Sequence, residues 1–254
     1  MCQSQRFYNE RFTTMASTLM PTSAARSEAA GQVDAEARRA LAWTHTARFL
    51  TTASALAELP VTELPEIAFV GRSNAGKSTA INVLTQQKRL AFASKTPGRT
   101  QHINLFELGP KLAPDALFAD LPGYGYAAVE RSKKLRWQEV MAEYLEVRRN
   151  LTAIVVLLDS RLGFTELDMN LLEFVGVRVG NGSVKMLVLL TKADKLGRRA
   201  LDKALASAQD TLAPLIGESA DVGVAPFSAL SRQGVNDAAL WLRRSIAVPG
   251  VPAP

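Results

Sequence analysis

The sequence is poor in the residues that build disulfide frameworks and metal clusters. Its 254 residues include one cysteine, Cys2, and two histidines, His45 and His102. A single cysteine cannot form a disulfide within the chain, and two histidines cannot form a histidine-rich metal site. Both classes of protein are therefore excluded. The near absence of cysteine suits a reducing cytoplasm, where we expect this protein to be located.

Long apolar segments are also missing. No run approaches the roughly 20 residues needed to span a bilayer, and the N-terminus lacks the continuous apolar stretch of a signal peptide. We therefore expect no membrane association. The composition, 47% hydrophobic and 21% charged, is sufficient for a sizeable core. The net charge of +6 favours a polyanionic partner such as RNA, although a merely soluble basic surface explains it nearly as well.

The chain length suits one domain with tails. Residues 1–40, which mix small polar residues with scattered arginines, are predicted to be a disordered N-terminal extension. Residues 41–247 are predicted to form a single domain, and residues 248–254 a short flexible tail. Residues 35–59 combine helical-looking and apolar stretches, and we expect them to be a lead-in that packs on the domain edge.

From residue 61 onward, short apolar strands alternate with amphipathic helices. Residues 153–158 are continuously hydrophobic, which is typical of strands buried on both faces. Proline and glycine at 109–110 and 114 indicate a hairpin between the second and third strands. The pattern predicts an α/β fold with a mostly parallel six-stranded sheet, one antiparallel edge strand and helices on both faces. Strands are predicted at 66–70, 103–108, 115–119, 152–158, 184–190 and 222–227, and helices at 77–87, 130–148, 166–177, 198–214 and 235–246.

Residues 71–78 form a complete G-x-x-x-x-G-K-[ST] phosphate-binding loop between a short apolar run and a predicted helix. In that position, backbone N–H groups are directed at bound phosphate. Lys77 is expected to contact the β- and γ-phosphates, and Ser78 to offer its hydroxyl to Mg²⁺. The alternative is a structural turn with a solvated lysine. The predicted nucleotide-binding residues are Gly71, Arg72, Ser73, Asn74, Ala75, Gly76, Lys77 and Ser78.

A second motif, D-x-x-G, comprises Asp120, Leu121, Pro122 and Gly123 and follows the apolar run 116–119. An aspartate at a strand end beside a phosphate loop can hold Mg²⁺ through water, and the glycine N–H can donate to a γ-phosphate. The motif alone is weak because ordinary turns use the same residues. Its place downstream of the phosphate loop favours the functional interpretation.

A third motif, Thr191, Lys192, Ala193 and Asp194, comes directly after the predicted strand 184–190. The carboxylate of Asp194 can accept hydrogen bonds from the N1–H and the 2-amino group of guanine. Adenine offers neither donor and would leave the carboxylate unpaired, so the motif favours guanine. The aliphatic stem of Lys192 can lie on the base. The alternative is an ordinary helix cap.

Two further segments are candidates by position. Residues Phe227, Ser228 and Ala229 follow the last predicted strand, where a backbone N–H can donate to guanine O6. Between the phosphate loop and Asp120 lies a segment with Pro97 and Gly98, which indicate a flexible loop. A threonine hydroxyl is needed there to join Mg²⁺ when a γ-phosphate is present, and by residue type both Thr96 and Thr100 qualify.

Taken together, the stretches 71–78, 97–101, 120–127 and 191–194 closely resemble the EngB (YihA/YsxC) family of bacterial GTP-binding proteins, of the TrmE-Era-EngA-EngB-Septin-like class. The resemblance covers about residues 48–246, and the long N-terminal extension departs from it. It implies a P-loop GTPase fold, GTP or GDP with Mg²⁺ as ligands, and catalytic roles for Lys77, Asp120 and Gly123. It also implies metal ligation by Ser78 and Thr100, and nucleotide contacts from Gly98, Arg99, Thr100, Gln101 and His102.

The resemblance further implies a role in assembly of the large ribosomal subunit and a link to cell division and septation. The expected partners are GTP and the large subunit or its ribosomal RNA, and we expect a monomer. Residues 124–137, which carry Tyr124 and a set of basic and aromatic side chains, are a candidate RNA-binding face. A solvated amphipathic helix is the alternative.

The predicted GTPase lacks a water-orienting glutamine, because Tyr124 occupies the position where many GTPases place that residue. We therefore predict slow hydrolysis without a partner. Asn74 resembles the asparagine of GTPases that use K⁺ in place of an arginine finger, although a loop-bracing amide is the alternative. Two competing functions remain open: a kinase or ATPase with the same loop, and a nucleotide-binding module without useful turnover.

Overall fold

The structure is a computed structural model of the chain, and it describes residues 23–91, 102–124, 141, 143–215 and 217–246. The chain divides into two compact units, Met1–Glu36 and Ala37–Pro254. The helix α2, Ser23–Thr44, contributes to both units. All seven strands belong to the second unit, which carries every described candidate site residue.

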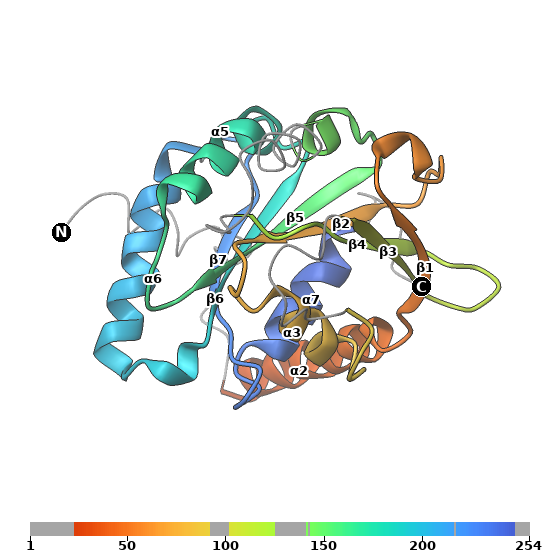
Figure 1. The fold of residues 1–254 in the computed structure, drawn as a ribbon. Helices are drawn as coiled ribbons and strands as arrows, with labels where there is room; N and C mark the ends of the chain where they lie inside the picture. The colour runs from red at the N-terminus through yellow and green to blue at the C-terminus, as the bar shows by residue number, and fades with distance from the viewer. Residues whose placement is uncertain (1–22, 92–101, 125–140, 142, 216, 247–254) are drawn as a thin grey trace. The chain divides into compact units, whose positions relative to one another are not determined.

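The second unit is built on one sheet with the strand order β1-β3-β4-β2-β5-β6-β7 (Figure 1). The strands β4, β2, β5, β6 and β7 are mutually parallel, whereas β3 is antiparallel to both of its neighbours. The antiparallel part of the sheet therefore lies at one edge. The strands are β1 (Arg48–Ala53), β2 (Glu66–Gly71), β3 (Ile103–Leu108), β4 (Ala116–Asp120), β5 (Leu151–Asp159), β6 (Lys185–Thr191) and β7 (Val222–Pro226).

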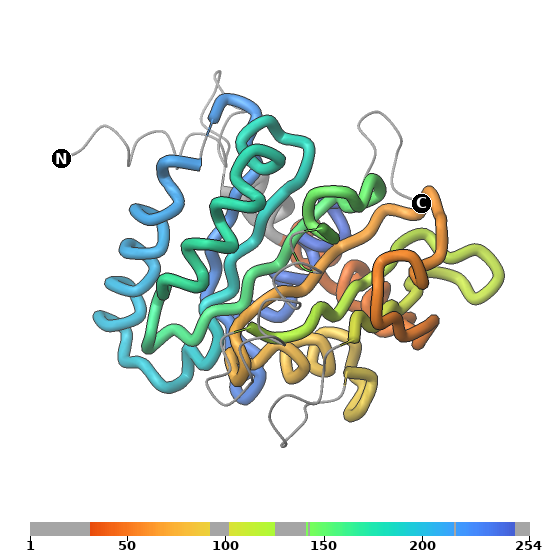
Figure 2. The backbone as a smooth tube through the Cα atoms, turned by 45° about the horizontal axis from the view of Figure 1, so that its top comes forward, coloured from red at the N-terminus to blue at the C-terminus, as the bar shows by residue number. Residues whose placement is uncertain are grey.

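Helices cover both faces of the sheet, and the alternation along β2 shows how the two cores are divided. Ala68 and Val70 belong to the core on the side of α5 and α6, while Ile67 and Phe69 belong to the core on the side of α3 and α7. Figure 2 shows α5 and α6 next to each other on their side of the strands. The remaining elements are α3 (Lys77–Leu84), α5 (Glu166–Gly180), α6 (Arg198–Leu212), α7 (Val235–Ser245) and the short helices η1 (Leu56–Glu58), η2 (Ala193–Lys195) and η3 (Ala213–Leu215).

The predicted fold class is confirmed, with seven strands in place of six. The additional strand, β1, lies in the segment 35–59, which the sequence predicted as a lead-in on the domain edge. β1 pairs outside β3, where Arg48 forms an ion pair with Glu107 at 3.0 Å and the Thr52 hydroxyl donates to Asn104 at 2.8 Å. These partners are 59 and 52 residues away in the sequence, so no local pattern reveals them.

One other segment differs from the prediction, and a second lies partly outside the described residues. α2 begins at Ser23, inside the segment 1–40 predicted to be disordered, because its alanine-rich sequence has a high intrinsic helix propensity; residues 1–22 lie outside the described residues. The helix predicted at 130–148 agrees with the structure at residues 141 and 143–147, which are helical; residues 125–140 and 142 lie outside the description. Among the described helices, none is long and apolar enough to cross a membrane.

Candidate functional site

The phosphate loop adopts the strand–loop–helix arrangement that its sequence predicts. It leaves the buried strand β2 at Gly71 and enters α3 at Lys77. Any Cβ at Gly71 would lie 2.8 Å from the Leu157 carbonyl oxygen, so the close approach of β5 requires glycine. Gly76 has φ +95°, which also favours glycine. The loop therefore presents its backbone at the amino end of α3, with Ser78 half-buried in the first turn.

A buried ion pair joins the phosphate loop to the D-x-x-G motif. The Lys77 ammonium contacts the Asp120 carboxylate at the end of β4, and the two residues are 8% and 1% exposed. Leu121 and Pro122 are buried beside it, whereas Gly123 is half-buried. A Cβ at Gly123 would lie 3.4 Å from backbone atoms of Ser73, so the motif rests directly against the loop.

Tyr124, the residue after the D-x-x-G glycine, is bound to the phosphate loop through its backbone and to α5 through its side chain. Its N–H donates to the Gly71 carbonyl at 3.3 Å, and its carbonyl accepts from the Ser73 N–H at 2.8 Å. Its phenol donates to the Asp168 carboxylate at 2.6 Å. Burial, reinforced by that carboxylate, raises the pKa of the Tyr124 phenol well above its usual value.

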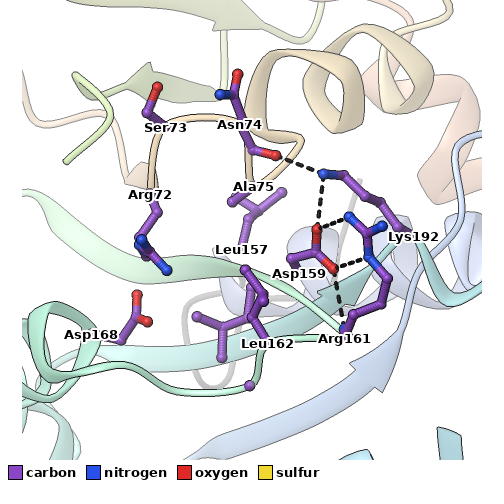
Figure 3. Close-up of a pocket in the computed structure, with 12 residues that line it drawn as sticks. Arg72, Ser73, Asn74, Ala75, Leu157, Asp159, Arg161, Leu162, Asp168 and Lys192 are labelled. Atoms are coloured by element: carbon purple, nitrogen blue, oxygen red, sulfur yellow. Dashed lines mark hydrogen bonds and ion pairs between the residues drawn. The ribbon is translucent and has the colours of Figure 1, made fainter. Parts of the chain in front are cut away.

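The T-K-A-D motif follows β6 and is tied to the phosphate loop. The Thr191 hydroxyl lies 2.6 Å from the Ala75 carbonyl oxygen and 2.9 Å from that of Leu158. The Lys192 ammonium donates to the Asn74 carbonyl at 2.8 Å and to the Asp159 carboxylate at 2.9 Å (Figure 3). Lys192 itself has φ +56°, in the left-handed region.

Asp194 is held by the segment after β7. The Ser228 hydroxyl donates to the Asp194 carboxylate at 2.6 Å, and the Lys195 ammonium lies 3.6 Å from the other oxygen. This arrangement, chiefly the serine hydrogen bond, lowers the pKa of the Asp194 carboxyl below its usual value. The Phe227 carbonyl accepts from the Ala193 N–H at 3.2 Å, so the two predicted base-recognition segments are connected through backbone as well.

A cavity of about 240 Å³ opens beside the phosphate loop (Figure 3). It contains an ion cluster in which Arg161 donates to Asp159 through two guanidinium nitrogens, at 2.9 and 2.7 Å. These hydrogen bonds, together with Lys192, hold the pKa of the Asp159 carboxyl well below its usual range. The cavity is lined by residues 72–75, 157–159 and 161–163, by Asp168 and by Lys192.

The structure thus brings together the phosphate loop, D-x-x-G, T-K-A-D and 227–229. Four other predicted contacts, Gly98, Arg99, Thr100 and Gln101, lie outside the described residues. His102 is exposed, and its Nδ1 lies 2.9 Å from the Ser54 hydroxyl oxygen. The sequence interpretation did not single out Asp159, Arg161 or Asp168. Only Asp168 has a local signal, the capping box that it forms with Thr165.

The parallel sheet and the phosphate loop with its neighbouring motifs define the class of protein: a P-loop GTPase. Residues 66–192 match the family model described as "50S ribosome-binding GTPase". The chain is 63% identical over 203 residues to "Probable GTP-binding protein EngB" of Acidovorax ebreus (strain TPSY), covering 79% of this chain and 89% of that protein. The corresponding protein of Albidiferax ferrireducens is 60% identical over 204 residues, covering 80% and 95%.

The chain belongs to the EngB family of GTP-binding proteins. Among solved structures, a crystal structure of a probable GTP-binding protein EngB is similar, with a TM-score of 0.53 and 20% identity. The likeness covers 71% of this chain and 98% of that one and supports the fold alone.

Proposed function

We propose that this protein binds GTP with Mg²⁺, hydrolyses it slowly, and acts as a nucleotide-dependent switch in assembly of the large ribosomal subunit. The observation that carries the proposal is the connection between the two halves of the site. Thr191 contacts the Ala75 carbonyl of the phosphate loop, and Lys192 donates to the Asn74 carbonyl. Groups suited to a guanine base and groups suited to phosphates are therefore joined by hydrogen bonds.

In this proposal the Asp194 carboxylate accepts from the N1–H and the 2-amino group of guanine, and the Lys192 stem lies on the base. The N–H groups of Phe227 and Ser228 already donate to the carbonyls of Leu190 and Gln233, at 2.9 and 3.0 Å. That leaves the N–H of Ala229 as the donor to guanine O6 within this segment. The Ser228 hydroxyl orients the carboxylate before the base arrives.

The phosphates would be held by the backbone N–H groups of residues 72–78 and by the Lys77 ammonium, which stabilises charge that develops on the γ-phosphate oxygens. The oxygen groups beside the phosphate loop suit Mg²⁺, because the Ser78 hydroxyl is a hard oxygen ligand and the Asp120 carboxylate could hold the ion through water. By the family resemblance, Thr100 is the second direct metal ligand. The metal would neutralise phosphate charge, and the Gly123 N–H would donate to the γ-phosphate.

Slow turnover follows from the direction of the Tyr124 side chain. Its phenol donates to Asp168 and is buried, so it offers no group to orient an attacking water. We propose that a partner, or K⁺ bound near the exposed Asn74, completes the site. Equal phosphate-release rates in K⁺ and Na⁺ would remove the role of K⁺. A binding module without useful turnover is the second candidate, favoured by the same buried phenol.

The ribosomal partner is proposed from the family description and from the basic net charge of +6. We also propose that the protein is a cytoplasmic monomer and that it is linked to cell division. Co-sedimentation with large ribosomal subunits, under a GTP analogue, GDP and no nucleotide, tests it. Binding that increases with the GTP analogue is expected, and binding that ignores nucleotide would contradict the switch.

The guanine site is tested by titrating labelled GTP and ATP into the wild-type protein and Asp194→Asn. The wild type should prefer GTP, and the variant should lose GTP affinity by about a hundredfold or more. Xanthosine triphosphate should partly restore binding, because its 2-oxo group accepts from the asparagine amide. Asp210→Asn, an exposed change on α6, is the control. An unchanged preference for GTP in Asp194→Asn would exclude this site.

A further inference from the structure

Asp168 connects the D-x-x-G segment to the beginning of α5. It is fully buried, and one carboxylate oxygen accepts the Tyr124 phenol at 2.6 Å. The other oxygen accepts the N–H and the hydroxyl of Thr165, the N-cap of α5, at 2.8 and 2.6 Å. One carboxylate therefore serves two elements, the helix cap and the segment next to the phosphate loop.

The attachment of Tyr124 restricts its neighbour Gly123. The backbone of Tyr124 makes two hydrogen bonds to the phosphate loop, through Gly71 and Ser73. A displacement of the D-x-x-G glycine that carries Tyr124 with it breaks these bonds or withdraws the phenol from Asp168. Because Tyr124 is 3% exposed, a withdrawn phenol also loses its packing in the core.

The surroundings of Asp168 favour a firm attachment. The phenol stays protonated at neutral pH, so it acts as a permanent donor. A phenol buried without an acceptor is costly, because its desolvation is not compensated. In Figure 3, Asp168 and Arg72 lie on the same side of the cavity, and both line it. Asp168, in the first turn of α5, thus lines the same cavity as Arg72, the first residue after Gly71.

We propose that Asp168 is a positioning residue for nucleotide discrimination: through Tyr124 it holds Gly123 at the phosphate loop, and so strengthens binding of the γ-phosphate. The inference rests on the proposed function, in which the Gly123 N–H donates to that phosphate. Loss of the attachment weakens GTP binding and leaves GDP binding nearly unchanged. A purely structural role would weaken both nucleotides alike.

The test compares two buried phenol–carboxylate pairs. Tyr124→Phe removes the hydrogen bond to Asp168, whereas Tyr144→Phe removes a hydrogen bond of the same kind to the buried Glu66, at the first residue of β2. Affinities for a non-hydrolysable GTP analogue and for GDP are measured by fluorescence titration, with thermal melting of each variant. We expect Tyr124→Phe to reduce analogue affinity about five- to tenfold, as for one hydrogen bond, and to change GDP affinity less than about twofold. Tyr144→Phe should leave both affinities unchanged.

A second variant checks that Asp168 is the partner through which the phenol acts. Asp168→Ala removes the acceptor of the phenol, so it should show a reduced ratio of GTP-analogue to GDP affinity, and adding Tyr124→Phe to it should cause little further loss in that ratio. An unchanged ratio in Tyr124→Phe, or full additivity in the double variant, overturns the inference. If the wild-type protein bound neither nucleotide, the proposed function itself would fail. If it bound both and Tyr124→Phe kept the ratio, only this inference would fail.

Discussion

Two buried tyrosines in this molecule donate to buried carboxylates at opposite ends of the parallel strands. Tyr124 donates to Asp168 near the phosphate loop, and Tyr144 donates to Glu66 where β2 begins. Burial raises the pKa of both phenols. The two pairs have the same chemistry, yet their surroundings differ.

The difference lies in what else each carboxylate binds. Glu66 also accepts from the Arg148 guanidinium at 3.0 and 2.9 Å, so its charge is neutralised by a cation. Asp168 receives hydrogen bonds from neutral donors among the described residues, the phenol and the two groups of Thr165. Glu66, paired with Arg148, therefore fixes the core at the beginning of β2. Asp168, shared between Tyr124 and Thr165, connects the candidate site to α5.

Removing the cation from the first network is expected to have the largest effect. Arg148→Met leaves Glu66 as an uncompensated buried charge and should lower the free energy of unfolding by about 3–5 kcal/mol, measured by urea denaturation. Nucleotide affinities should stay the same, because the network lies away from the phosphate loop. Arg149→Met, an exposed neighbouring substitution, is the control. A loss below about 1 kcal/mol would show that Glu66 is not held as an ion in the core.

Asp168→Ala should have a smaller effect on stability but should also change binding. It leaves the Tyr124 phenol buried without an acceptor and removes the side-chain partner of the Thr165 N-cap. We expect a loss of about 2–3 kcal/mol in the free energy of unfolding together with a lower preference for GTP over GDP. Glu166→Ala, in the same first turn but exposed, should change neither. Equal losses of GTP and GDP affinity in Asp168→Ala would show that the Asp168 network, like the Glu66 network, does not contribute to nucleotide discrimination.

Local motifs could be predicted from the sequence, whereas contacts between distant residues could not. The phosphate loop, D-x-x-G and T-K-A-D are short local motifs, and the strands that position them are continuously hydrophobic, so both were predictable. The Tyr124–Asp168 bond joins residues 44 positions apart, and the Lys192–Asn74 bond joins residues 118 apart. Such partners depend on the tertiary fold. The pairing of β1 also depends on the tertiary fold. In addition, its Phe49 and Leu50 are exposed, so the strand lacks the pattern of a buried strand.

A third hydroxyl–carboxylate pair, Ser228 and Asp194, extends the comparison to a partly buried pair, where the effect should be smallest. Here the hydroxyl lowers the pKa of the carboxyl, whereas in the buried pairs the carboxylate contributes to raising the pKa of the phenol. Because the folded-state pKa of Asp194 is depressed, its contribution is present above the ordinary pKa and is lost as the pH falls through the lowered value. Ser228→Ala should therefore move this loss to higher pH.

The measurement is GDP affinity followed from pH 7 toward about pH 3, below the ordinary pKa of a carboxyl, for the wild-type protein and Ser228→Ala. At pH 7 the two affinities should agree within about threefold, because Asp194 is ionised in both and only one hydrogen bond is lost. At the acidic end the variant should lose affinity first, since its carboxylate protonates sooner and a protonated acid no longer accepts two hydrogen bonds from guanine. Ser231→Ala, which keeps the Ser228 hydroxyl, should follow the wild-type curve. Overlapping curves for the wild type and Ser228→Ala would mean that the serine does not lower the pKa of Asp194, and that this partly buried pair differs from the buried tyrosine pairs in strength as well as in sign.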